Sequence, residues 1–419
     1  MSKNKQLKDK LNLIREKYGT NNDSKTESYA RLLKRRRMEQ RKTLEEVASG
    51  VCSTSYLCRI ENAQVEVDDQ FFEHLFEKLE ISYEEVKEQN KTNVLKELLK
   101  FYLQRDYNKM HELGNKVVTS NVYSDIELKL VVLFLNILEE RYEEARLIII
   151  ELERLTHILV GFELITYTFL SALLSYKINN IVSAFKLLRV LEGITYEDEI
   201  LHEAVIDLTL SVYSIMDEDV LFIEAYHTYK SFNTPRLSTN EKIIHEFEYL
   251  LIISKNDYNQ GVKKFNELCD YEESDELKEA YYYNLVKLNL FFNEYNKSFE
   301  LLEKAPMTSK MICLLDYCIN NCNNLIKAVS YIEMLRKFKF TKYESFHLFY
   351  NEFTIKKIEK MNNFEIVDFI KRNFMNNKYE IKELKNCLIT KNIYYLYMES
   401  LYEIGKYKEI AKYSLELRR

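Results

Sequence analysis

The sequence contains very little glycine and proline. Its 419 residues include 7 glycines, 2 prolines and no tryptophan, whereas average usage would give about 29 glycines and about 21 prolines. β-Sandwiches, barrels and doubly wound α/β enzymes use both residues at turns, strand ends and phosphate-binding loops. The shortage therefore excludes most folds of these classes. The 46% hydrophobic and 30% charged residues suit long, half-exposed helices, so we expect an all-α protein.

Long apolar runs are also missing. Residues 1–17 are polar and basic and lack the apolar core of a secretory signal. The most apolar stretch, residues 128–138, is shorter than the ~18–20 residues needed to span a bilayer. The seven cysteines are odd in number and scattered, which is typical of reduced thiols in a cytosol. We expect a cytoplasmic protein that makes no membrane contact.

Charge is distributed unevenly along the chain. Residues 1–62 carry 15 Lys/Arg against 8 Asp/Glu, a net charge of +7, and the other residues carry 45 against 58, a net charge of −13. A basic segment indicates a polyanionic partner. An acidic body would be repelled by DNA, so the two parts should do different work.

Beyond residue 90 a short motif recurs in long apolar helices. It has an aromatic or aliphatic anchor after a polar residue and often a small residue three or, once, four positions later, such as Ala145, Ala184, Ala225, Ala328 and Ala411. The anchors are 30–43 residues apart: Tyr107, Tyr142, Ile181, Phe222, Tyr258, Tyr295, Leu325, Phe364 and Tyr407. This pattern resembles tetratricopeptide repeats, in which the anchor fills the gap between two helices. The resemblance implies a right-handed superhelical solenoid of about nine helix pairs over residues 90–419.

Residues 43–62 have the pattern of two short helices joined by a tight turn. Thr43 and Glu46 can form a capping box, Gly50 suits a turn that needs a positive φ, and Ser53 or Thr54 can cap the second helix. The inner faces would then hold Val47 and Ala48 on the first helix and Leu57 and Ile60 on the second. This arrangement is a DNA-reading helix-turn-helix.

Residues 29–81, including the ending Ile60-Glu61-Asn62, resemble the Xre/Cro repressor family. The sequence departs from the family at Leu44, where glutamine is usual, and at Ala63, where glycine is usual. The resemblance implies a five-helix DNA-binding domain over residues 29–89, preceded by a polar basic leader over residues 1–28. Thr54, Ser55, Tyr56 and Arg59 would meet base edges.

The predicted DNA interface also includes basic side chains of the preceding helix, which would contact phosphates. The alternative is that they form only a solvated basic face. The complete set is Arg31, Lys34, Arg35, Arg36, Arg37, Thr43, Ser53, Thr54, Ser55, Tyr56, Arg59 and Asn62, with Arg41 and Lys42 as further basic neighbours.

A helix-turn-helix followed by an acidic repeat body is similar to the peptide-pheromone receptors of Gram-positive bacteria, the Rgg, PlcR, NprR, PrgX and Rap group. The resemblance implies a homodimeric transcriptional regulator in quorum sensing, which binds a palindromic double-stranded DNA operator and a short linear signalling peptide. Asn136, Asn284 and Asn289 lie within predicted helices, where asparagine is disfavoured, and are candidates to bind the peptide backbone. A buried structural hydrogen bond is the alternative. We expect the apolar stretch 393–404 to supply the dimer contact.

Other chemistry is not indicated. The sequence contains no nucleophile elbow, Walker A, zinc-protease or dinucleotide motif, so we expect no enzyme activity, no cofactor and no metal. Cys313, Cys318 and Cys322 cluster without a nearby histidine and fit a core better than a zinc site. A redox switch at Cys52 and Cys58 remains an alternative. So do two other functions: a regulator whose repeats dock a protein, and an adaptor that has lost DNA binding.

Overall fold

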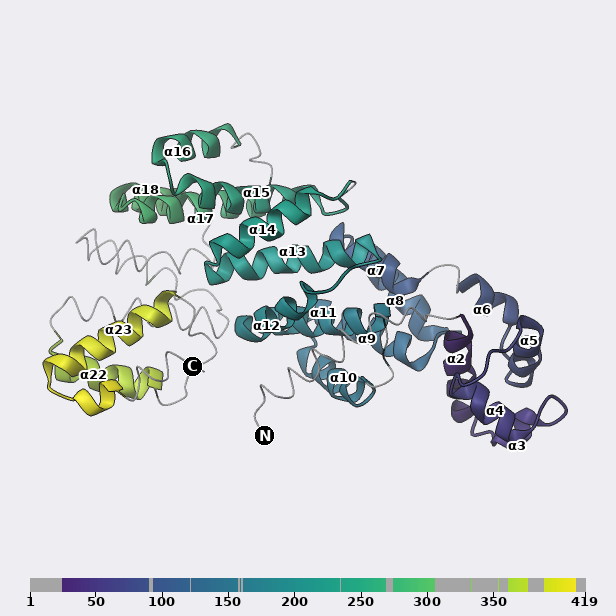
Figure 1. Ribbon diagram of the computed structural model, residues 1–419. Coiled ribbons are helices and arrows are strands. Elements are labelled where there is room, and N and C mark those ends of the chain that lie inside the picture. The colour runs from purple at the N-terminus through teal and green to yellow at the C-terminus, as the bar shows by residue number, and fades with distance from the viewer. Residues whose placement is uncertain are drawn as a thin grey trace. The chain divides into compact units, whose positions relative to one another are not determined.

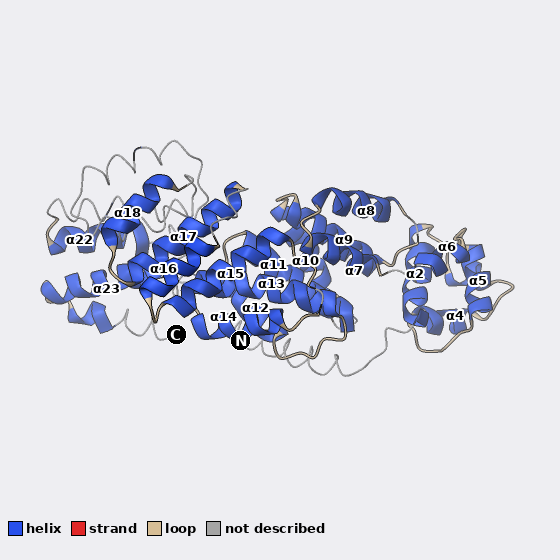
Figure 2. Cartoon of the chain, turned by 90° about the horizontal axis from the view of Figure 1, so that it is seen from above, coloured by secondary structure: helices blue, strands red, loops and turns tan. Residues whose placement is uncertain are grey.

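The computed structural model describes residues 25–89, 93–120, 122–156, 159, 161–233, 235–268, 274–305, 333, 353, 361–375 and 388–411. Within these residues there are helices and turns but no strand (Figure 2), which confirms the all-α class. None of the described helices is both long and apolar enough to cross a membrane. Residues 1–24 of the leader lie outside the described residues, and so do Leu325 and the cluster of Cys313, Cys318 and Cys322.

Five helices form the N-terminal part of the chain, here called the head (residues 25–89; Figure 1). They are α2 (Lys25–Glu39), α3 (Leu44–Ala48), α4 (Thr54–Glu61), α5 (Asp69–Lys78) and α6 (Tyr83–Gln89). The head is built around aromatic side chains: the Tyr29 ring lies edge-on to Phe72 and Phe76, at centroid distances of 5.1 and 5.6 Å.

The remaining helices form the repeat region (residues 93–411). They are α7 (Val94–Leu103), α8 (Tyr107–Thr119), α9 (Asp125–Leu138), α10 (Tyr142–Arg154), α11 (Gly161–Lys177), α12 (Ile181–Leu191), α13 (Glu199–Met216), α14 (Asp219–Lys230), α15 (Thr239–Ser254), α16 (Tyr258–Glu267), α17 (Asp275–Phe291), α18 (Tyr295–Lys304), α22 (Asn363–Ile370), the π-helical turn η2 (Lys371–Met375) and α23 (Leu388–Glu403).

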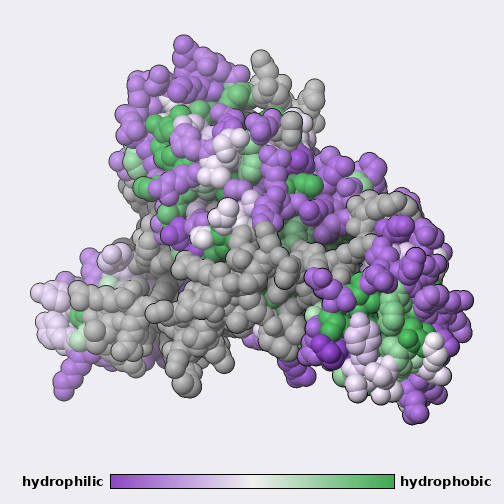
Figure 3. Space-filling view, turned by 45° about the vertical axis from the view of Figure 1, so that its right-hand side comes forward, coloured by the Kyte–Doolittle hydropathy of each residue, from purple (hydrophilic) through white to green (hydrophobic). Residues whose placement is uncertain are grey.

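Neighbouring helices of the repeat region pack in pairs. Helix α7 packs on α8, α9 on α10, α15 on α16 and α17 on α18. The first helices of successive pairs also contact each other: α9 contacts α11, and α15 contacts α17. The chain divides into two compact units, of which the first contains the head together with α7–α11, and the second contains α14–α23. In Figure 3 hydrophilic side chains cover most of the visible outer surface of the described helices.

Most of the turns within the described pairs share one backbone geometry, and the turn between α15 and α16 is the exception. A residue with positive φ closes the first helix at Arg105 (57°), Glu140 (59°), Asn179 (59°), Asp217 (54°), Asn293 (62°) and Gly405 (75°). Where the bond is recorded, the next N–H donates to the carbonyl five residues back, as Arg141 does to Asn136 at 2.9 Å and Glu294 to Asn289 at 2.8 Å. This is the Schellman hydrogen bond that satisfies the carbonyls at a helix end. In each of these turns the next helical residue follows within two residues of the positive-φ residue.

The predicted anchors begin helices but do not all fill the gaps between them. Five of them, Tyr107, Tyr142, Ile181, Tyr258 and Tyr295, are the first residues of their helices. Phe222 and Ile181 are buried, as expected. The expected packing is wrong for Tyr107, Phe364 and Tyr407, whose side chains are 42%, 66% and 60% exposed, because an aromatic residue in the first turn can point along the surface.

The position three residues after the anchor is buried more consistently than the anchor itself, and it holds Met110 in one pair and small residues in several others. Ala145, Ala184 and Ser298 are fully buried there. At Gly261, the equivalent position of the Tyr258 pair, an added Cβ would lie 2.5 Å from the Cβ of Ser254. The second helix therefore approaches the first too closely for a larger side chain.

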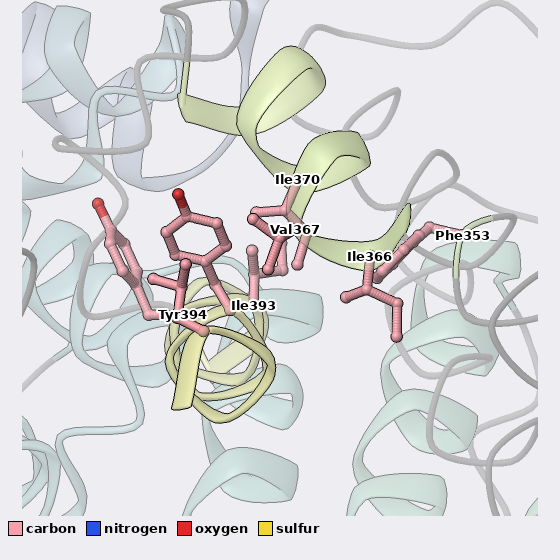
Figure 4. Close-up of a cluster of buried hydrophobic side chains, with 8 residues drawn as sticks. Phe353, Ile366, Val367, Ile370, Ile393 and Tyr394 are labelled. Atoms are coloured by element: carbon pink, nitrogen blue, oxygen red, sulfur yellow. The ribbon is translucent and has the colours of Figure 1, made fainter. Parts of the chain in front are cut away.

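The C-terminal apolar stretch packs inside its own chain. Ile393, Tyr394, Tyr397 and Leu401 of α23 lie against α22 and Phe353 in one buried cluster (Figure 4), with Leu396 and Ile404 partly buried beside it. The expectation that this stretch is free to contact a second subunit is wrong for its buried members. The exposed aromatic side chains at this end are Phe364, Tyr395, Tyr402 and Tyr407.

We predict that Ala63→Gly stabilises the protein by about 1 kcal/mol, because an alanine at φ 50° carries left-handed strain that glycine does not. Ala63 is exposed, so the substitution removes no packing. Urea denaturation measures the change. Ser49→Gly, at an exposed residue with φ −53°, is the control and should give no gain; equal stability of Ala63→Gly and wild type would contradict the argument.

A second prediction concerns the close approach of α15 and α16. Gly261→Ala should lower the free energy of unfolding by about 1–3 kcal/mol, since the new methyl group meets a Cβ that cannot rotate away. Gly114→Ala is the matched control, because its nearest obstacles are the terminal methyl carbons of Leu135, which can move. A Gly261→Ala protein no less stable than Gly114→Ala would exclude this explanation of Gly261.

Candidate nucleic-acid interface

Helices α3 and α4 form as the capping pattern predicts. The Thr43 hydroxyl accepts from the N–H of Glu46, and the Glu46 carboxylate accepts from the N–H of Thr43 at 2.6 Å. Ser53 caps α4 by accepting from the N–H of Tyr56. Gly50 has φ 75°, and Leu57 and Ile60 are completely buried. The capping box, the glycine turn and the inner faces are therefore confirmed.

A half-buried ion pair ties the end of α4 to α2. The guanidinium of Arg37 donates to both carboxylate oxygens of Glu61, from Nε at 2.7 Å and Nη2 at 2.8 Å. Their side chains are 16% and 3% exposed. The hydrogen bond to Glu61 raises the pKa of Arg37 above its ordinary value, in opposition to burial. This bidentate geometry fixes the orientation of α4 as well as its distance from α2.

The opposite side of α4 is open. Thr54, Ser55, Cys58, Arg59 and Asn62 are exposed, and their spacing places them on one stripe of the helix. Arg59 forms no hydrogen bond or ion pair with the described residues. This stripe presents hydroxyls, an amide and a guanidinium, which are the groups that read base edges in a major groove.

Two residues of the predicted DNA interface, Tyr56 and Asn62, have a contact inside the head. Tyr56 is half-buried and its ring lies edge-on to Phe71, at a centroid distance of 5.8 Å. Asn62 accepts from the ammonium of Lys34 at 3.0 Å and donates to the carbonyl of Cys58 at 2.8 Å. Both remain at the edge of the exposed stripe.

The arginines of α2 are engaged within the chain. Arg31 pairs with Glu163, Arg35 donates to Glu39 and to the carbonyl of Tyr123, and Arg36 pairs with Glu39. Three of the arginines expected to contact phosphates therefore have partners inside the chain. By contrast, Arg41 is exposed at φ 54°, and its side chain makes no hydrogen bond within the described part of the chain. Arg41 lies two residues before the cap of α3.

The cysteines near α4 differ in environment. Cys58 is exposed, and Cys52 is half-buried. Burial raises the pKa of the Cys52 thiol, which lowers the fraction of reactive thiolate at neutral pH. The structure thus offers little chemical support for a redox switch at Cys52.

The three candidate asparagines are almost entirely covered. Asn136, Asn284 and Asn289 are 5%, 2% and 2% exposed, so they do not line an open groove as expected. Asn289 accepts from the Tyr258 hydroxyl at 2.8 Å, which is a structural hydrogen bond between α16 and α17. Asn284 donates to the carbonyl of Ala280 at 2.9 Å, and its buried Oδ1 has no partner among the described residues.

Comparisons with known proteins identify no relatives. No protein-family model matches the chain, and it has no significant match among curated proteins or among solved structures. The function must therefore be inferred from the geometry of the head and the repeat region.

We predict that Glu61→Ala destabilises the protein by about 3 kcal/mol, because it leaves the Arg37 guanidinium without its partner in a half-buried position. Glu39→Ala is the control. It removes a carboxylate that is 40% exposed, and exposed ion pairs contribute less than about 1 kcal/mol. Guanidinium chloride is unsuitable because it screens ion pairs, so urea denaturation is the measurement. Equal losses for the two variants would show that the Arg37–Glu61 pair has no special role.

Proposed function

We propose that the chain is a sequence-specific DNA-binding transcriptional regulator. The observation that carries this proposal is the exposed stripe of α4, which presents Thr54, Ser55 and Arg59 on a helix that is capped, packed and ion-paired on its other sides. A helix-turn-helix domain places the N-terminal residues of its second helix against base edges. Helices α3 and α4 would be that pair.

Phosphate contacts would come from basic side chains beside this stripe. Arg41 is exposed close to the start of α3, and Lys42 donates to the carbonyl of Lys78 at 2.8 Å, which holds its ammonium at the head's surface. A single small head buries too little DNA surface for tight specific binding. Two heads of a homodimer on a palindromic operator would supply the remainder.

The repeat region would bind the signalling ligand. A stack of paired helices offers an extended surface suited to linear ligands, and a short signalling peptide is the ligand that the resemblance implies. The buried asparagines do not add to this part of the proposal. Calorimetric titration of the full chain with a candidate peptide tests it, and absence of heat at millimolar peptide would argue against that peptide.

A protein partner is the second candidate for the repeat region. Leu147 and Ile150 lie one turn apart on α10 and are 63% and 49% exposed. Large apolar side chains grouped on a helix surface favour a protein contact. Under this alternative, the head would act as proposed and the repeats would dock a protein instead of a peptide.

We predict that Arg59→Ala and Arg41→Ala change DNA binding differently. Arg59→Ala should relax preference at one base position per half-site, at a cost of about 1–3 kcal/mol on the best sequence. Arg41→Ala should weaken binding to all sequences alike and reduce the salt slope by about 1. Fluorescence anisotropy after selection of an operator from a random DNA library measures both effects. If Arg59→Ala keeps both affinity and sequence preference, the proposed face of α4 does not read DNA.

A further inference from the structure

Two arginines of α2 reach from the head into the repeat region. Nη1 of Arg31 lies 2.5 Å from Oε2 of Glu163, and Nη1 of Arg35 donates to the backbone carbonyl of Tyr123 at 2.6 Å. The partners are 132 and 88 residues away in sequence. All four residues lie in the same compact unit, and α2 packs directly on α9.

These contacts are shielded from solvent. The side chains of Arg31, Glu163 and Arg35 are 17%, 15% and 12% exposed, whereas the surface pair Lys116–Glu112 on α8 is 69% and 68% exposed. Partly buried charges are screened much less than exposed ones. The contacts therefore constrain geometry in a way that ordinary surface pairs do not.

The two contacts reach successive helix pairs. Tyr123 immediately precedes Ser124, which caps α9, and Glu163 is in the first turn of α11. Arg31 and Arg35 are one turn apart on α2, so their Cβ atoms are only about 6 Å apart. A rigid helix that bonds to the starts of both α9 and α11 fixes their relative position. A shift between them that exceeds the tolerance of a hydrogen bond must open one contact.

We propose that Arg31 and Arg35 form a latch that couples the arrangement of the α9 and α11 pairs to the orientation of the head, and that they are not phosphate contacts. The same helix holds the reading helix α4 through Arg37. A rearrangement between the two pairs would therefore reach α4 through α2. The coupling to DNA depends on the proposed function, whereas the latch itself does not.

The latch can be tested without DNA. Spin labels introduced as non-canonical amino acids at the exposed residues Glu45 and Lys116 report the distance between head and repeats by pulsed electron paramagnetic resonance. We expect one narrow distance distribution for the wild type and loss of that single narrow peak for Arg31→Glu. The charge-swapped double variant Arg31→Glu with Glu163→Arg should recover it. The matched control is Arg36→Gln, which removes an arginine of α2 whose recorded ion pair stays within α2, and it should leave the distribution unchanged.

Two results would overturn the latch. One is an unchanged distribution in Arg31→Glu, and the other is a lost peak that the charge swap does not recover. If Arg31→Glu does not fold, as judged by circular dichroism, Arg31→Gln replaces it and must still broaden the distribution.

A second measurement separates the latch from phosphate binding. If Arg31 is a latch residue, Arg31→Gln leaves the salt slope of DNA binding unchanged, while Arg41→Ala reduces it. A reduction of about 0.9 in the slope for Arg31→Gln would identify a phosphate contact and overturn the assignment. If no variant binds DNA, the proposed function fails, and the distance measurement still decides whether the latch exists.

Discussion

The orientation of helix α4 depends on how α2 is held by its own arginines. Arg37 fixes α2 to the last turn of α4, and Arg31 and Arg35 fix it to the repeat region. A guanidinium remains charged at all relevant pH values and presents five donors in a planar fork. One helix can therefore make directional contacts on different sides while its apolar residues, such as Leu32 and Leu33, fill the core of the head.

These ion pairs determine geometry more than they determine net stability. Removing two charges from water offsets most of their mutual attraction, so a buried pair is weak evidence for stability, although breaking one is destabilising. An apolar contact tolerates sliding, whereas the bidentate bond between Arg37 and Glu61 does not. Such contacts suit an interface between two helices, such as α2 and α4, whose relative orientation must be fixed. Arg31, Arg35 and Arg37 thus have partners inside the chain and need no polyanion to balance their charge.

Local features of the head could be predicted from the sequence because they depend on neighbours in the chain. The Thr43–Glu46 box, the Gly50 turn and the buried side of α4 involve residues at most a few positions apart. The roles of Arg31 and Arg35 could not be predicted in this way. Their partners, a carboxylate and a backbone carbonyl, are about a hundred residues distant in the sequence. The net charge of the segment indicates only that negative groups would balance it. A carboxylate of the same chain meets that condition as well as a phosphate does.

The asparagines show a related limit in the repeat region. Their mid-helix positions correctly indicated a special environment, but composition cannot distinguish a ligand-facing amide from a buried one. Asn289 is a buried structural residue, because its carboxamide oxygen accepts a hydrogen bond from the Tyr258 hydroxyl of the adjacent helix. That partner follows from how the helices pack, which the repeat spacing does not specify.

The weak sequence repetition has a physical origin in the turns. Each Schellman turn is closed by backbone hydrogen bonds, so it requires a backbone conformation and not a particular side chain. The chain meets this requirement with arginine, glutamate, asparagine and aspartate as well as glycine, which accounts for regular helix pairs in a glycine-poor sequence. The anchor residues are then free to vary and even to lie on the surface. The position three residues later is buried more consistently, and it requires a very small residue where two helices approach as closely as they do at Gly261. Turns closed by backbone hydrogen bonds fix few side chains, so the helix pairs are more regular in structure than in sequence.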